Sequence, residues 1–157
     1  MKVALHLNGA QTEIEVRADE SLLDALRARD LRGCRLTCGI GLCGACTVLL
    51  DGQPVATCLL LAPLAEGRAV TTIEGLEGDD ALQHAFVEYS AFQYGYCTPG
   101  MILTARALLD ETPHPTDEEI RHALAGNLCR CGCYPKIVSA VRSAATASER
   151  GRREPDP

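Results

Sequence analysis

Cysteine is the residue type in this sequence that most clearly indicates a chemical function. The 157 residues include nine cysteines, namely Cys34, Cys38, Cys43, Cys46, Cys58, Cys97, Cys129, Cys131 and Cys133. An odd number fits poorly with a closed set of disulfides. The first residues alternate between polar and apolar types, so we expect no export signal and a reducing, cytoplasmic location, with export alongside a partner left open. Metal ligation by thiolates is therefore the leading interpretation.

Four cysteines in the first half have a spacing that is typical of an iron-sulfur site. Cys38, Cys43, Cys46 and Cys58 follow the pattern C-x4-C-x2-C-x11-C. In the plant-type arrangement a loop wraps a 2Fe-2S cluster and a remote strand supplies the fourth thiolate. Glycines at 39, 41 and 44 let the backbone curl closely and direct N–H groups at sulfur. The sequence predicts a first 2Fe-2S cluster on these four residues.

Two other interpretations of this group are weaker. A four-cysteine zinc site usually has two short C-x2-C pairs, and buried free cysteines commonly occur singly. Neither pattern accounts for C-x4-C-x2-C. Cys34 lies outside the motif, and we expect it to be a buried or partly shielded thiol beside the loop.

The remaining cysteines stand at expected helix boundaries in the second half. Cys97 precedes Thr98 and Pro99, a cap and first-turn pair, and the run from Cys129 to Cys133 precedes Pro135. Helix N-termini carry unpaired N–H groups and a partial positive charge that stabilise thiolates. We expect these helix ends to meet and to bring the thiolates together.

Three motifs together resemble the iron-sulfur subunit of the xanthine oxidase and aldehyde oxidase family of molybdenum hydroxylases. They are residues 38–48, residues 97–101 (CTPGM) and residues 126–131 (GNLCRC), and the resemblance covers residues 2–145. It implies an α+β fold, in which an N-terminal ferredoxin-like β-grasp domain precedes a C-terminal four-helix bundle, each with one 2Fe-2S cluster. It also implies that electrons pass from molybdopterin-bound molybdenum in a large partner subunit, through both clusters, to an FAD-binding subunit or another acceptor.

The second cluster motif departs from that family at one ligand position. The family pattern is Q-C-G-[FY]-C-T-P-G, whereas Tyr94 stands here at the position of its first cysteine. Cys133, just beyond the C-R-C pair, restores the count, so our hypothesis is a ligand set of Cys97, Cys129, Cys131 and Cys133. The alternatives are an unligated Cys133, an oxygen ligand at Tyr94, or no second cluster. The resemblance further implies that Gln93 and Cys131 approach the pterin.

The elements that position these residues divide into two halves. Residues 1–75 alternate as strands do and contain one short helix, residues 76–147 follow a helical period, and residues 148–157 are expected to be disordered. The expected strands are 3–7, 12–16, 47–50, 55–61 and 70–73, and the expected helices begin at Ser21, near 82, at Pro99, after Thr116 and at Pro135. A small mixed sheet and a compact helical bundle follow from this pattern.

Composition excludes several functions for the chain by itself. The net charge is −6 with no internal basic block, which argues against nucleic-acid binding, and no apolar run is long enough to insert in a membrane. We find no acid–base pair, activated nucleophile or P-loop. Because two cluster domains fill the 157 residues, the molybdenum and flavin that the resemblance implies are expected in partner chains. A stand-alone ferredoxin and a zinc-stabilised interaction module stay open as alternatives.

Overall fold

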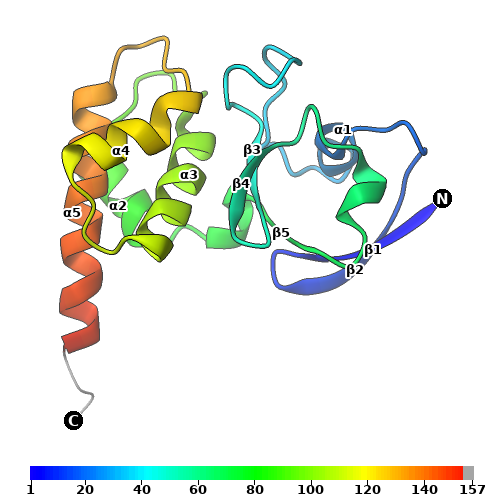
Figure 1. Ribbon diagram of the computed structural model, residues 1–157, viewed down its shortest axis with the longest axis horizontal. Coiled ribbons are helices and arrows are strands. Elements are labelled where there is room, and N and C mark those ends of the chain that lie inside the picture. Colours follow the sequence, from blue (N-terminus) through cyan, green and yellow to red (C-terminus); the bar gives the residue numbers. More distant parts are fainter. Residues whose placement is uncertain (154–157) are drawn as a thin grey trace.

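Two packed units lie side by side in the computed structural model, which describes the backbone of residues 1–153 and the side chains of residues 1–147 (Figure 1). The first unit is built on a sheet and the second on helices, so the predicted α+β fold is confirmed. Within residues 1–153, no helix combines the length and the apolar character needed to cross a membrane. The predicted boundary after residue 75 falls inside a short 3-10 turn, η2 (Ile73–Leu76). Of the tail predicted to be disordered, 148–157, residues 148–153 belong to the last helix, and residues 154–157 lie outside the described residues.

The sheet has five strands in the order β2-β1-β5-β3-β4. Their bounds are β1 Lys2–Leu7, β2 Ala10–Glu15, β3 Thr47–Leu50, β4 Gln53–Ala56 and β5 Ala69–Thr71. Strands β1 and β2 form an antiparallel hairpin, and both turn residues, Asn8 and Gly9, have positive φ, as the predicted two-residue turn requires. Strand β5 pairs parallel with β1 and antiparallel with β3, which makes the sheet mixed.

One predicted strand is shorter than expected. The pattern predicted a strand over 55–61, but β4 ends at Ala56 and the chain turns away from the sheet before Cys58. Apolar residues alone suggested a longer strand. The backbone instead leaves the ladder there, which carries the Cys58 thiol toward the loop of residues 38–46.

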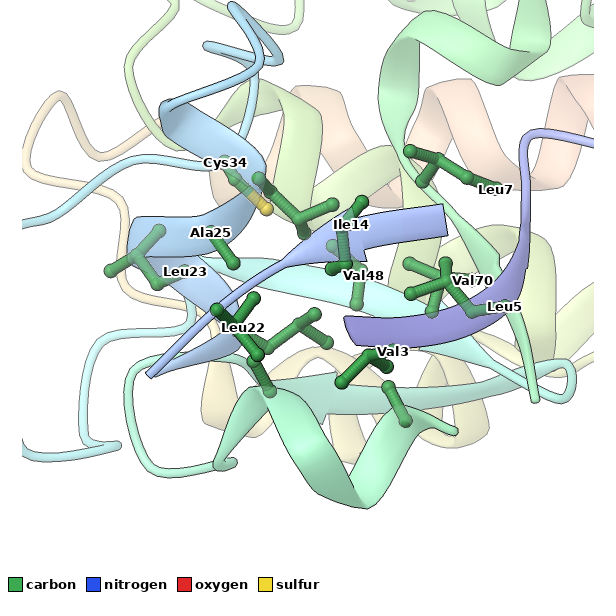
Figure 2. Packing of buried hydrophobic residues seen from close by; sticks show 14 of the residues in the cluster. Val3, Leu5, Leu7, Ile14, Leu22, Leu23, Ala25, Cys34, Val48 and Val70 are labelled. Carbon is green, nitrogen blue, oxygen red and sulfur yellow. The ribbon is translucent and has the colours of Figure 1, made fainter. Parts of the chain in front are cut away.

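A short helix covers one face of this sheet. Helix α1 (Leu22–Arg27) begins after Ser21, whose Oγ accepts from the N–H of Asp24 at 3.1 Å. A 3-10 turn, η1 (Ala62–Ala65), packs nearby. Figure 2 shows side chains of α1 packed against those of the strands, with the sulfur of Cys34 in the same apolar cluster. This core holds the base of the cysteine loop.

Up to residue 153, where the described backbone ends, the second unit contains four helices, as the sequence predicted. They are α2 Ala81–Glu88, α3 Thr98–Glu111, α4 Asp117–Ala123 and α5 Tyr134–Arg153, with a 3-10 turn, η3 Leu124–Gly126, after α4. Asp80 and Thr116 each form a capping box, which fixes the starts of α2 and α4. Thr98 was expected to cap α3, but it is the first helical residue and Cys97 occupies the cap position.

Helix α3 joins the two units. Leu103 and Ala107 pack against Leu49 of β3, and Ile73 and Leu76 of the connecting turn lie against the same cluster. Because α3 contacts both the sheet and the other helices, its first turn is held close to the loop that precedes β3. The two cysteine-bearing loops consequently lie at the same end of the molecule, above β3 and above α5 in Figure 1.

Candidate metal centres

Three cysteines of the first group, Cys38, Cys43 and Cys46, lie in a tight loop between α1 and β3, and Cys58 follows β4. Gly39, Gly41 and Gly44 all have positive φ, which L-residues with side chains rarely adopt. The N–H of Gly41 points at Sγ of Cys58 at 3.3 Å. The N–H of Leu42 points at Sγ of Cys38 at 3.4 Å. Backbone donors aimed at sulfur are among the features that tune a 2Fe-2S cluster, so this loop fits such a cluster.

The thiols of this group interact in pairs in the metal-free chain. The pKa of Cys38 is lowered to about 6, first by the N–H of Ile40 and then by the N–H and side chain of Cys43. The pKa of Cys58 is raised to about 11, mainly by burial and then by the thiol of Cys46. The structure therefore brings Cys38 beside Cys43 and Cys58 beside Cys46.

The second group forms where the start of α3 meets the turn before α5. Burial, followed by the neighbouring thiol of Cys129, raises the pKa of Cys97 to about 12. Burial by itself would raise the pKa of Cys129. The pKa is lowered overall, because the N–H groups of Cys133, Cys131 and Gly132 donate to this sulfur. Compared with Cys97 and Cys133, whose pKa values are raised, Cys129 is the favoured thiolate.

Cys133 belongs to the second group in space. It is 5% exposed, and burial together with the neighbouring Cys129 and Cys131 raises its pKa. Tyr94 is 84% exposed, and Gln93 beside it is also at the surface. The structure therefore gathers Cys97, Cys129, Cys131 and Cys133, and leaves Tyr94 in solvent.

A cavity of about 450 Å³ opens between the two groups. Its lining includes cysteines of both groups and three tyrosines, namely Cys43, Cys97, Cys131, Tyr94, Tyr96 and Tyr134. The hydroxyl of Tyr134 accepts the N–H of Cys129 at 2.8 Å, which ties the start of α5 to the cysteine turn. No pattern in the sequence indicates this bond.

Hydrogen bonds connect the loops directly, and two of them involve Leu128 and Tyr96. The N–H of Leu128 donates to the carbonyl oxygen of Cys43 at 2.9 Å. The hydroxyl of Tyr96 donates to the carbonyl oxygen of Leu36 at 3.0 Å, and the guanidinium of Arg35 lies over the same ring at 4.8 Å. The two cysteine groups are therefore neighbours, joined through backbone atoms next to the cysteines.

Cys34 is a buried thiol outside both groups, as the sequence predicted. It is 1% exposed, and burial raises its pKa to about 12. Its Sγ lies 3.6 Å from the carbonyl oxygen of Cys46, which also accepts from Oγ1 of Thr57 at 2.7 Å. These contacts hold the backbone of Cys46 in place.

No group of three or more His, Cys, Asp or Glu side chains among residues 1–147 is arranged to hold a single metal ion. A 2Fe-2S cluster divides its ligands between two irons, so each iron needs only two protein ligands. The two thiol pairs of the first group, Cys38 with Cys43 and Cys58 with Cys46, match an arrangement of two ligands for each iron.

The fold and the two cysteine groups define a protein with two iron-sulfur centres. Residues 5–72 match a family model described as a 2Fe-2S iron-sulfur cluster binding domain. Residues 72–142 match a second model, described as a 2Fe-2S binding domain. The two matches meet at residue 72, close to the connection between the sheet and the helices.

Known proteins resemble the chain over nearly its whole length. The nicotinate dehydrogenase small FeS subunit of Eubacterium barkeri is 50% identical and covers 90% of this chain and 93% of its own. The aldehyde oxidoreductase iron-sulfur-binding subunit of Escherichia coli (strain K12) is 40% identical over 92% of this chain and 72% of its own. A chain in the crystal structure of quinoline 2-oxidoreductase from Pseudomonas putida 86 superposes with a TM-score of 0.91 at 42% identity, covering 96% of this chain and 97% of that one.

The chain belongs to the family of small 2Fe-2S subunits of the xanthine oxidase and aldehyde oxidase type of molybdenum hydroxylase. It is an electron-transfer subunit of an oxidoreductase of this family, as the sequence predicted.

Proposed function

We propose that this chain carries electrons between a large molybdopterin-binding subunit and an FAD-binding subunit or another acceptor, in a cytoplasmic complex. The observation that carries the proposal is the direct backbone link between the two cysteine groups, from Leu128 to Cys43. A cluster bound in each group accepts and releases single electrons. The cytoplasmic location is supported by nine cysteines that form no disulfide in the structure, which suits a reducing compartment.

The first cluster is assigned to Cys38, Cys43, Cys46 and Cys58. The contacts between these thiols and the N–H groups of the loop support the assignment. Those N–H groups stabilise the negative charge that a cluster gains on reduction. Ile40, Leu42 and Leu59 are exposed apolar side chains near this loop, and we assign them to the face that meets the electron acceptor.

The second cluster is assigned to Cys97, Cys129, Cys131 and Cys133. Burial of Cys133 beside Cys129, and the exposure of Tyr94, support the replacement of the family ligand. Oγ1 of Thr98, next to Cys97, is buried and has no hydrogen-bond partner among the described residues. Because buried hydroxyls are rarely left unpaired, a cluster sulfur is a suitable acceptor for it.

We further assign the surface around Gln93 and Cys131 to the pterin-facing side. Gln93 and Tyr94 are exposed, and Cys131 lines the cavity between the two groups. Exposed polar and aromatic side chains beside a thiol suit contact with a partner's heterocycle.

Metal analysis of the complex purified from its native source tests this proposal. We expect about four iron and about four inorganic sulfides per copy of this chain, together with a larger molybdenum-containing chain. As a control, Cys38→Ser is expected to remove about half of the iron while leaving the signal of the second cluster. Zinc alone would support an interaction module instead, and isolation as a functional lone carrier would refute the subunit assignment.

A further inference from the structure

Asn127 is a buried polar residue at the junction of the two units. It is 5% exposed and lies between η3 and the second cysteine group. Its Nδ2 donates to the carbonyl oxygen of Gly44 at 3.1 Å and lies 3.4 Å from Oγ1 of Thr47. Its Oδ1 accepts from Oγ1 of Thr104 at 3.0 Å. One side chain therefore links the first cysteine loop, strand β3 and helix α3.

The backbone next to Asn127 extends the same link. The N–H of Leu128 donates to the carbonyl oxygen of Cys43, so residues 127 and 128 bind residues 43 and 44 in succession. Cys129 follows at once in the second group, and Cys43 belongs to the first. The connection thus joins positions that are adjacent to, or part of, the two proposed ligand sets.

Glycines allow the two loops to approach this closely. A Cβ on Gly100, in the first turn of α3, would collide with the carbonyl oxygen of Gly44. A Cβ on Gly44 would collide with Nδ2 of Asn127 and with the carbonyl oxygen of Gly126. By contrast, a Cβ on Gly126 would meet nothing within 4 Å. The loops touch backbone to backbone, and the amide of Asn127 donates to the carbonyl oxygen of Gly44 across this contact.

We propose that Asn127 is a positioning residue that fixes the separation of the two clusters. This inference rests on the proposed function, because it requires a cluster in each cysteine group. Each transfer between them oxidises one cluster and reduces the other by one electron, and no bond is made or broken. The contacts of Asn127 set the distance between the two clusters over which the electron moves. The thiolates bind each cluster but do not set that distance.

The separation can be followed by electron paramagnetic resonance of the purified complex. When both clusters are reduced, their magnetic interaction splits the signals, and the splitting weakens as the clusters move apart. Partial reduction gives the signal of each cluster alone. Asn127→Asp keeps the size of the side chain but places an acceptor against the carbonyl oxygen of Gly44. We expect weakened or lost splitting, with both separate signals retained.

A second pair of variants tests the same contact without removing a polar group. Gly100→Ala should force the carbonyl of Gly44 away and weaken the splitting, although alanine favours the helix that contains it. Gly126→Ala is the matched control, and it should keep the wild-type splitting because its Cβ meets nothing. Wild-type splitting in Gly100→Ala with full iron would overturn the inference, even where Asn127→Asp fails to assemble. Absence of two 2Fe-2S signals from the unaltered complex would instead refute the proposed function.

Discussion

Replacing Cys133 with serine is expected to remove the second cluster and leave the first. Cys133 is 5% exposed and lies against Cys129 and Cys131, so it is surrounded by protein and by the other proposed ligands. A serine hydroxyl is a poor substitute because iron-sulfur clusters are held by cysteine thiolates. The unaltered chain should hold about four iron and the variant about two.

The assay is iron and sulfide analysis, followed by paramagnetic resonance of the reduced complex. Cys34→Ser is the matched control, since Cys34 is 1% exposed and lies outside both proposed ligand sets. It should keep about four iron. Adding Tyr94→Cys to the Cys133→Ser variant rebuilds the family pattern Q-C-G-[FY]-C and should restore the second signal. A Cys133→Ser complex with full iron and both signals unchanged would show that Cys133 is not a ligand.

Three further predictions concern residues around the cysteines. Thr98→Val should lower the reduction potential of the second cluster by about 40 mV in a redox titration, because the reduced cluster loses a hydrogen bond worth about 1 kcal/mol. An unchanged potential would contradict donation from the Thr98 hydroxyl to a cluster sulfur. Thr57→Val should reduce the free energy of unfolding by about 1 kcal/mol in thermal denaturation, because the carbonyl of Cys46 loses its 2.7 Å donor while the shape of the side chain is kept. In the metal-free chain, the lowered pKa of Cys38 predicts that its rate of alkylation rises as the pH increases through about 6. Cys34, whose pKa is raised to about 12, should stay unmodified at neutral pH. Equal reaction of both thiols would refute this prediction.

Local chemistry predicted the elements of this fold well. The Asn8-Gly9 turn fixes a hairpin by itself, because both residues tolerate positive φ. The capping box at Thr116 likewise marks the start of a helix from four consecutive residues. The strand expected over 55–61 was too long because its apolar pattern does not reveal that Cys58 must leave the ladder.

The contacts between the candidate centres could not be predicted in the same way. Asn127 and Gly44 are 83 residues apart, and nothing in either segment indicates the other. The cysteine spacing indicated which thiols belong together, but the donors that surround them come from backbone geometry that depends on the whole fold. The ligand sets themselves stay predictions until iron is measured.

The hydrogen bond from Leu128 to Cys43 also bears on how the protein is made. Domains generally fold in order as the chain leaves the ribosome, so the sheet is complete well before residue 128 is synthesised. Until then the carbonyl of Cys43 lacks its final donor. The contact that joins the Cys43 loop to the helical half therefore forms only after residue 128 has been translated.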